Sequence, residues 1–198
     1  MSTLKKPPQF DKNEDYEKLY GRNIDFRKKT VLDVGAERGS TAYLFLEKGA
    51  ERVIAVEGNL TFFKELRENA LEDSRVHIIN VFINSPQILE QLLSIYKPHI
   101  IHMDCESCEQ FLIQVNPELL RLPEIYQLEV HWKRELLEIL LFTFIHLGYR
   151  AEIERIYTNS EACDPWNNLH YGYYGDIWML HLFKQEVDWW KVKEEEKK

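Results

Sequence analysis

The sequence predicts an α/β fold, with a three-layer, Rossmann-like arrangement around a seven-stranded sheet. Short apolar segments alternate with segments of helical spacing along most of the chain, which is typical of strands joined by helical crossovers. Strands connected in this way run parallel, with right-handed connections. The last two apolar segments have no helix between them. We therefore expect a mostly parallel sheet that ends in a C-terminal antiparallel hairpin.

Each element follows from an apolar run, a helical spacing or a stop signal. Val31, Leu32 and Val34 form a run of buried-strand type, Pro86 stands near a helix start, and Gly148 provides a helix stop. In chain order we expect a short helix within 15–29, a strand at 31–34, a helix at 40–48, a strand at 53–56, a helix at 60–71, a strand at 76–81, a helix at 86–96, a strand at 99–103, a helical segment at 107–115, a strand at 125–130, a helix at 133–147, and strands at 149–157 and 177–183.

The length of 198 residues suits one compact domain. We expect a loosely ordered N-terminal segment at 1–14, a single domain at 15–190 and a charged tail at 191–198. The segments at the two ends are polar or charged and contain no repeat.

The composition argues against several classes of protein. The formal net charge of −8 makes nucleic acid an unfavourable partner, because affinity for its backbone depends on Lys and Arg. No apolar run reaches membrane-spanning length, and the N-terminus lacks the apolar stretch of a secretory signal. Three cysteines are too few for a disulfide framework, so we expect a cytoplasmic protein.

The segment 30–58 is typical of a nucleoside-binding unit. A strand is followed by a turn containing Gly35 and Gly39, then by a helix and by a second strand that ends at Glu57. Glycines permit a tight turn and the close approach of a ligand to the backbone. The Glu57 carboxylate can accept hydrogen bonds from both hydroxyls of a ribose. The alternative is an α/β turn that binds nothing.

The residues between the glycines favour S-adenosylmethionine over a dinucleotide. A dinucleotide site needs G-x-G-x-x-G, whereas this turn reads D-V-G-A-E-R-G and places the charge of Glu37 where a pyrophosphate would lie. S-adenosylmethionine has no phosphate and carries two cationic groups. Asp33 fits its cationic amino-acid tail, and we expect Gly35, Ala36 and Gly39 to contact that end. A nicotinamide cofactor remains the alternative.

Further candidates lie where the predicted strands end, because ligands of open α/β sheets bind outside the carboxyl ends of the strands. Asn80 ends the third strand and is a candidate for cofactor binding. Asp104 ends the fourth strand and could orient or deprotonate a hydroxyl. Glu106 and Glu109 could hold the donor's ammonium group, bind substrate hydroxyls or cap the next helix. The alternative is that these acids only complement a helix N-terminus.

His131 ends the fifth strand, where it could act as a general base or be a buried structural residue. Cys105 and Cys108 form a single C-x-x-C, which is weak support for zinc binding or redox chemistry and favours a packed helix start. No metal site is predicted.

The segment 160–176 is rich in aromatic residues and follows a strand expected to end at the same edge. Trp166, His170 and Tyr171 could bind a substrate there, because aromatic faces suit sugar rings and flat molecules. The alternative is a packed cover for the hairpin.

The run HMDCESCEQ resembles the K-I-D-x-E-G-x-E signature of the FkbM-type methyltransferases. VIAVEGNLTFFKELRENA and YQLEVHW are similar to further parts of that family, and the resemblance covers about residues 28–183. Five strand–helix units followed by a hairpin are also the pattern of the class I methyltransferase fold. One departure is Ser107, which stands where the family usually has glycine. The resemblance implies methyl transfer from S-adenosylmethionine, usually to oxygen, on sugars or other secondary metabolites, and it strengthens a functional interpretation of Asp104 and Glu106.

These observations predict an S-adenosylmethionine-dependent methyltransferase that acts on a hydroxyl of a sugar or another small metabolite. Asp104 and His131 are the candidates for chemistry on the acceptor, which would be a small molecule or a glycan. Mg²⁺ on these carboxylates is compatible with the sequence but not required by it. The alternatives are a non-catalytic module that binds S-adenosylmethionine as a scaffold, and an NAD-dependent enzyme.

Overall fold

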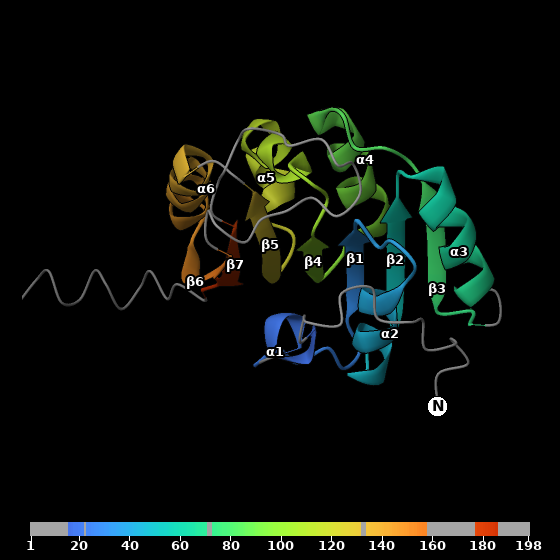
Figure 1. Cartoon of the computed structure of the whole chain (residues 1–198). Helices are drawn as coiled ribbons and strands as arrows, with labels where there is room; N and C mark the ends of the chain where they lie inside the picture. Colours follow the sequence, from blue (N-terminus) through green and yellow to red (C-terminus); the bar gives the residue numbers. More distant parts are fainter. Residues whose placement is uncertain (1–15, 22, 71–72, 132–133, 158–176, 186–198) are drawn as a thin grey trace, which may run out of the picture.

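The computed structural model of the chain describes residues 16–21, 23–70, 73–131, 134–157 and 177–185. These residues form a sheet of seven strands in the order β3-β2-β1-β4-β5-β7-β6, with helices on both of its faces (Figure 1). In chain order the elements are α1 (Tyr16–Tyr20), β1 (Thr30–Val34), α2 (Ser40–Glu47), β2 (Arg52–Glu57), α3 (Leu60–Ala70), β3 (Val76–Asn80), α4 (Pro86–Tyr96), β4 (Ile100–Met103), the 3₁₀ helix η1 (Cys108–Gln114), α5 (Pro117–Leu120), β5 (Ile125–His131), α6 (Arg134–His146), β6 (Tyr149–Tyr157) and β7 (Ile177–Lys184).

The predicted fold class is confirmed. Strands β1 to β5 pair in parallel, whereas β7 pairs antiparallel with both β5 and β6. The C-terminal hairpin therefore inserts its second strand between β5 and β6. This order is that of the class I methyltransferase fold, and it differs from the all-parallel order 3-2-1-4-5-6 of a dinucleotide-binding sheet.

Two hydrophobic cores lie on opposite faces of the sheet and explain its three layers. One core includes Phe45 of α2 and Leu66 of α3, together with Tyr20 of α1. The other includes the apolar side chains of α4 and α6, among them Leu93 and Phe144. Successive residues of a strand point to opposite faces, so the apolar runs of the central strands supply both cores.

Two elements differ from the sequence prediction. The segment expected to be helical at 107–115 forms the 3₁₀ helix η1, which follows two residues of positive φ, Glu106 and Ser107. The short helix α5 was missed, although Pro117 in its first turn and the Asn116 side chain, which accepts a hydrogen bond from the Glu118 N–H, are start signals. The short helix expected within 15–29 is present as α1.

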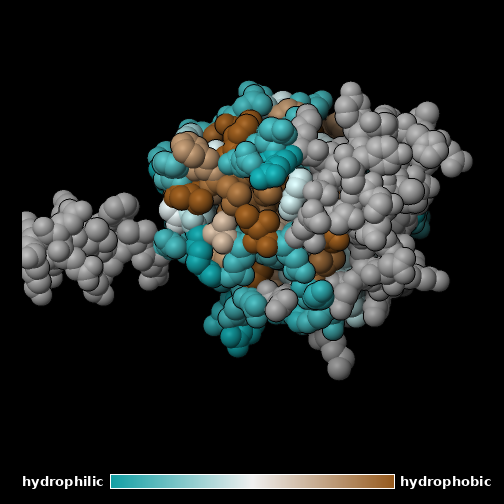
Figure 2. Space-filling view, turned by 60° about the vertical axis from the view of Figure 1, so that its left-hand side comes forward, coloured by the Kyte–Doolittle hydropathy of each residue, from teal (hydrophilic) through white to brown (hydrophobic). Residues whose placement is uncertain are grey.

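The surface carries apolar side chains on α6, where Ile139, Phe142 and Ile145 are exposed. In Figure 2 the side of the molecule with α6 and β6 is turned toward the viewer, and hydrophobic surface gathers there between hydrophilic margins. Within the described part of the chain, none of the helices combines the length and apolar character needed to cross a bilayer.

Candidate functional site

The carboxyl edge of the sheet, where β1 to β5 end, contains most of the predicted site residues. Residues 35–39, which we call the nucleoside turn, connect β1 to α2. The N–H groups of Gly35 and Ala36 both donate to the carbonyl of Val56, at 2.9 and 3.1 Å. The Glu37 N–H donates to Glu57 Oε2 at 2.8 Å. Three consecutive N–H groups of the turn are thus bonded to the end of β2 rather than directed toward a ligand.

Glu57 ties the turn to the strand that it ends. Its Oε1 accepts the N–H of Asn59 at 2.6 Å, and its main-chain carbonyl accepts Asn80 Nδ2 at 2.8 Å. Burial raises the pKa of the Glu57 carboxyl, and the hydrogen bonds from Asn59, Glu37 and Gly58 oppose that shift. Each carboxylate oxygen has two lone pairs, so a buried and oriented Glu57 retains acceptor capacity for further donors.

Gly35 and Gly39 are required by their surroundings. Gly35 has a φ of +88°, and a Cβ atom there would lie 1.7 Å from the carbonyl oxygen of Asp104. Gly39 has a φ of +95° and precedes α2, where a Cβ would meet Leu66. Ala36 is buried beside them. The close approach of Gly35 to the backbone after β4 joins the nucleoside turn to the second half of the site.

Asp33, in β1 and two residues before the turn, is fully buried. Its Oδ2 accepts the Thr41 hydroxyl at 2.7 Å, and its Oδ1 lies 4.0 Å from His102 Nε2. Burial raises the pKa of Asp33 to about 7, with the Thr41 bond opposing and the charges of Glu57 and Glu37 adding to the shift. In this structure the carboxyl group therefore bonds to the start of α2 and does not face solvent.

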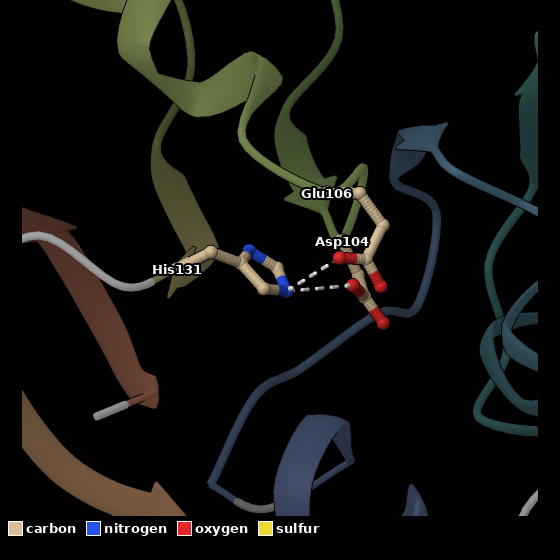
Figure 3. Close-up of side chains that lie close together, drawn as sticks. All are labelled: Asp104, Glu106 and His131. Atoms are coloured by element: carbon tan, nitrogen blue, oxygen red, sulfur yellow. Dashed lines mark ion pairs between the residues drawn. The ribbon is translucent and has the colours of Figure 1, made fainter. Parts of the chain in front are cut away.

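The second half of the site is centred on His131, the last residue of β5. Its Nε2 lies 3.8 Å from Asp104 Oδ1 and 3.8 Å from Glu106 Oε2, and it points toward both (Figure 3). Glu129 Oε1 lies 3.7 Å from the same nitrogen, and Glu109 Oε1 lies 3.5 Å from Nδ1. We call these five residues the acid–histidine cluster.

The charges of the cluster act on one another. Burial opposes the charged form of the His131 imidazole, but the Glu109 hydrogen bond and the charges of Glu109, Asp104 and Glu129 outweigh it and raise the pKa to about 10. The pKa of Asp104 is raised well above its ordinary value by burial and by the charge of Glu129, while His131 opposes the shift. One imidazolium cannot neutralise four carboxylates, so the excess negative charge of the cluster adds to the effect of burial on the pKa of Asp104.

Glu109 was predicted to reach substrate hydroxyls or the donor, and the structure puts it elsewhere. Its side chain is fully buried, and Oε1 accepts the main-chain N–H of His131 at 3.0 Å. It therefore supports His131 from within the protein. Cys105 and Cys108 form a disulfide across the start of η1, in the loop that carries Asp104, Glu106 and Glu109.

Two members of this network were not found from the sequence. Glu129 is buried in β5, and its Oε2 accepts the hydroxyl of Tyr20 at 3.0 Å. A signal for Glu129 was present, because Gln127, Glu129 and His131 alternate along β5 and so point to one face. Tyr20 had no such signal, since only the packing of α1 on the sheet brings it 109 positions along the chain to Glu129.

Phe82 is a further residue that the sequence did not single out. It follows β3 at the carboxyl edge, and its side chain is 70% exposed. Its ring lies against Gly58, where an added Cβ would be 2.7 Å from a ring carbon. An exposed aromatic face thus lies beside the end of β2 that carries Glu57. The remaining predicted substrate residues, Trp166, His170 and Tyr171, lie outside the described residues.

Comparisons with known structures agree with the fold. The chain is similar to the precorrin-6y C5,15-methyltransferase of Geobacter metallireducens, with 14% identity, a TM-score of 0.56, and 84% of this chain and 86% of that chain covered. It is also similar to TYW2 of M. jannaschii in complex with AdoMet, with 16% identity, a TM-score of 0.53, and 82% and 72% covered. A third similar structure is a protein of the NADB-Rossmann superfamily from Streptococcus agalactiae, with 12% identity, a TM-score of 0.60, and 91% and 71% covered.

At these identities the likeness defines the class of fold, which is that of the class I methyltransferases. No family model and no curated protein matches the sequence, so membership of the FkbM family stays a prediction.

Proposed function

We propose that the protein is an S-adenosylmethionine-dependent methyltransferase that acts on a hydroxyl of a small molecule, with a sugar or another metabolite as the acceptor. The observation that supports this most is the insertion of antiparallel β7 between β5 and β6, which is the sheet order of class I methyltransferases. Because a fold alone does not define an activity, the proposal also depends on the residues at the carboxyl edge.

The nucleoside turn suits a donor without phosphates. A pyrophosphate is held by backbone N–H groups at a glycine turn and a helix N-terminus. Here the N–H groups of residues 35–37 are already bonded to Val56 and Glu57, and the Glu37 carboxylate would repel an anion. These contacts favour S-adenosylmethionine over NAD, the less favoured alternative.

The residues of the first half then have complementary tasks. Glu57, oriented by Glu37 and Asn59, would accept the ribose hydroxyls, and Asn80 would hold the end of β2 in place. The backbone of Gly35, Ala36 and Gly39 would lie against the amino-acid end of S-adenosylmethionine. Asp33 would act indirectly, through its hydrogen bond with Thr41 at the start of α2.

S-adenosylmethionine supplies an electrophilic methyl group on a sulfonium ion. An acceptor oxygen would form a bond to that methyl carbon as the carbon–sulfur bond breaks and its electrons return to sulfur. The hydroxyl proton needs an acceptor, and a carboxylate whose pKa is raised is a stronger base than an ordinary carboxylate. Asp104 fits this task better than His131, whose raised pKa keeps it protonated. His131 would position Asp104 and hold its charge.

Calorimetry with S-adenosylhomocysteine and with NAD tests the cofactor. We expect binding of S-adenosylhomocysteine and none of NAD, and the reverse result would overturn the proposal. Glu57→Ala should weaken binding of S-adenosylhomocysteine by about tenfold or more, since a hydrogen bond to a charged group contributes about 1.5–3 kcal/mol. Glu51→Gln serves as the control, because Glu51 is exposed and precedes the first residue of β2, far along the strand from Glu57. This variant should bind S-adenosylhomocysteine as the wild type does.

Turnover separates an enzyme from the second alternative, a non-catalytic module that binds the donor as a scaffold. A panel of sugars, glycans and hydroxylated metabolites would be incubated with methyl-labelled donor. Labelled product from a hydroxyl acceptor supports the enzyme. Tight donor binding without transfer to any acceptor, in a protein that also fails to hydrolyse the donor, supports the scaffold.

A further inference from the structure

Three ligand atoms of the acid–histidine cluster converge at the carboxyl edge. A carboxylate oxygen each from Asp104 and Glu106 and a ring nitrogen of His131 lie within 4.8 Å of one another. The Nε2 separations of 3.8 Å to both carboxylates are longer than hydrogen bonds. They are close to the spacing of ligands that share one ion, because ligand atoms about 2.1 Å from a metal lie about 3–4 Å apart.

Burial of the three side chains is graded from the protein interior to solvent. His131 is 2% exposed, Asp104 31% and Glu106 74%. Two rigidly held ligands would therefore form the floor of a site, and the exposed Glu106 could close on an ion by a small side-chain movement. The solvent side would leave coordination positions for other oxygen atoms.

A carboxylate lies beside the ring nitrogen of His131 that faces away from Asp104 and Glu106, an arrangement found in many metal sites. Glu109 Oε1 lies 3.5 Å from His131 Nδ1 and accepts the main-chain N–H of the same residue. A carboxylate behind one ring nitrogen fixes the ring so that the other nitrogen faces the ion. Figure 3 shows Nε2 directed toward Asp104 and Glu106, which follow the neighbouring strand β4.

We propose that Asp104, Glu106 and His131 bind a divalent first-row transition-metal ion such as Mn²⁺. The coordination positions that these residues leave open would hold the acceptor oxygen, and this last role rests on the proposed methyl transfer. Two carboxylates with one imidazole suit such an ion better than Mg²⁺ or Ca²⁺, which prefer oxygen ligands alone. Because the imidazole binds in its neutral form, the ion must displace its proton.

Binding of Mn²⁺ alone, without donor or acceptor, tests the site. The full-length protein is treated with EDTA, dialysed and titrated with Mn²⁺, and the free ion is followed by its electron paramagnetic resonance signal. We expect one saturable site, with a pulsed spectrum that shows coupling to a ¹⁴N nucleus from His131. Binding that does not saturate below about 1 mM, or a bound ion without nitrogen coupling, would overturn the proposal.

Matched variants locate the ion. Glu106→Gln removes a ligand at an exposed position, so the fold should be retained and the affinity should fall at least about tenfold. His131→Gln should abolish the nitrogen coupling. Glu68→Gln, an exposed acid of α3, should leave both measurements unchanged. Equal affinity in the wild type and Glu106→Gln would show that Mn²⁺ binds elsewhere and would contradict the site.

The metal proposal and the methyltransferase proposal can be tested independently of each other. Mn²⁺ binding without binding of S-adenosylhomocysteine would leave the metal site and remove the function. Binding of S-adenosylhomocysteine with no Mn²⁺ site would remove the metal and leave the function.

Discussion

Several residues at the carboxyl edge carry ionisable side chains that are largely buried. Asp33, Glu57 and Glu109 are each buried, and each accepts hydrogen bonds from the protein rather than from solvent. Burial of a carboxyl group favours its neutral form, whereas the hydrogen bonds favour the ionised form. The balance differs from residue to residue, so the titration of single side chains can be used to test the structure.

Asp33 should make stability depend on pH. Its folded pKa of about 7 lies above its ordinary value of 3.8, so the folded state binds a proton that the unfolded chain has released. The contribution is fully present below pH 3.8 and is lost as the pH rises to about 7, with a slope of at most about 1.4 kcal/mol per pH unit. Asp33→Asn should remove this slope, as measured by urea denaturation at pH 5, 6, 7 and 8.

At each pH, the free energy of unfolding of Asp33→Asn is compared with that of the wild type. The amide side chain of the variant keeps the shape of a neutral acid and does not titrate, so the variant should gain stability relative to the wild type as the pH rises. A difference that stays constant across this range would mean that Asp33 is ionised in the folded protein.

Phe82 should contribute to donor binding by packing its exposed ring against the adenine ring of the donor. An aromatic contact contributes about 0.5–1.5 kcal/mol beyond area burial, so Phe82→Ala should weaken S-adenosylhomocysteine binding by about two- to tenfold. Stability should change little, because the side chain is 70% exposed. Ile95→Ala, at an exposed apolar residue of α4, is the matched control. If both variants bind equally well, the adenine ring does not contact Phe82.

At the scale of elements, the β1–turn–α2 unit and the end of β4 are fitted to each other without room for a side chain. Gly35 lies against the Asp104 carbonyl, and the Asp104 N–H donates to the carbonyl of Val34 at 3.0 Å. The half of the site assigned to the donor and the half assigned to the acceptor are therefore joined through backbone contacts.

Gly35→Ala should be strongly destabilising. The positive φ costs about 1 kcal/mol for a residue with a Cβ, and the clash with the Asp104 carbonyl adds about 1–3 kcal/mol. Gly148→Ala is a close control, because Gly148 has a φ of +91° and a Cβ there would meet nothing within 4 Å. Urea denaturation should show the smaller loss for Gly148→Ala. Equal losses would indicate that the turn moves away from β4 at little cost.

The element pattern was largely predictable because apolar periodicity and stop signals are local. The central strands and the helices at 40–48, 60–71 and 86–96 agree with β1, β2, β3, α2, α3 and α4 to within a few residues. The prediction was poorer at 105–120, where a disulfide, two residues of positive φ and two short helices occur together. Such a segment is shaped by its contacts rather than by the spacing of its apolar residues.

At the scale of the whole molecule, α1 connects the N-terminal part of the described chain to the last strand of the parallel set. Gln127 Nε2 donates to the Tyr20 carbonyl at 2.8 Å, and the Tyr20 hydroxyl donates to Glu129. The same Glu129 lies 3.7 Å from His131 Nε2. A residue that precedes the first strand thus positions the acid–histidine cluster.

Tyr20→Phe should destabilise the fold and disturb the cluster. Loss of a buried donor to a carboxylate costs about 1–3 kcal/mol, so the urea midpoint should fall. Tyr43→Phe in α2 removes a hydroxyl that has no such carboxylate partner among the described residues, and it should have a small effect. An NMR titration of the His131 ring should also change in Tyr20→Phe. An unchanged titration and midpoint would show that the Tyr20 hydroxyl does not hold Glu129.

The sequence by itself determined the fold class, the nucleoside turn and the polar ends of the strands, because strand ends and glycine turns are set by local patterns. It also placed Asp104 and His131 at the edge where a ligand would bind. Only the tertiary structure decided which side chains face the edge and which support it. Burial and partners depend on contacts between distant segments, and these contacts enclosed Asp33 and Glu109, brought Tyr20 to Glu129, and surrounded one imidazole with four carboxylates.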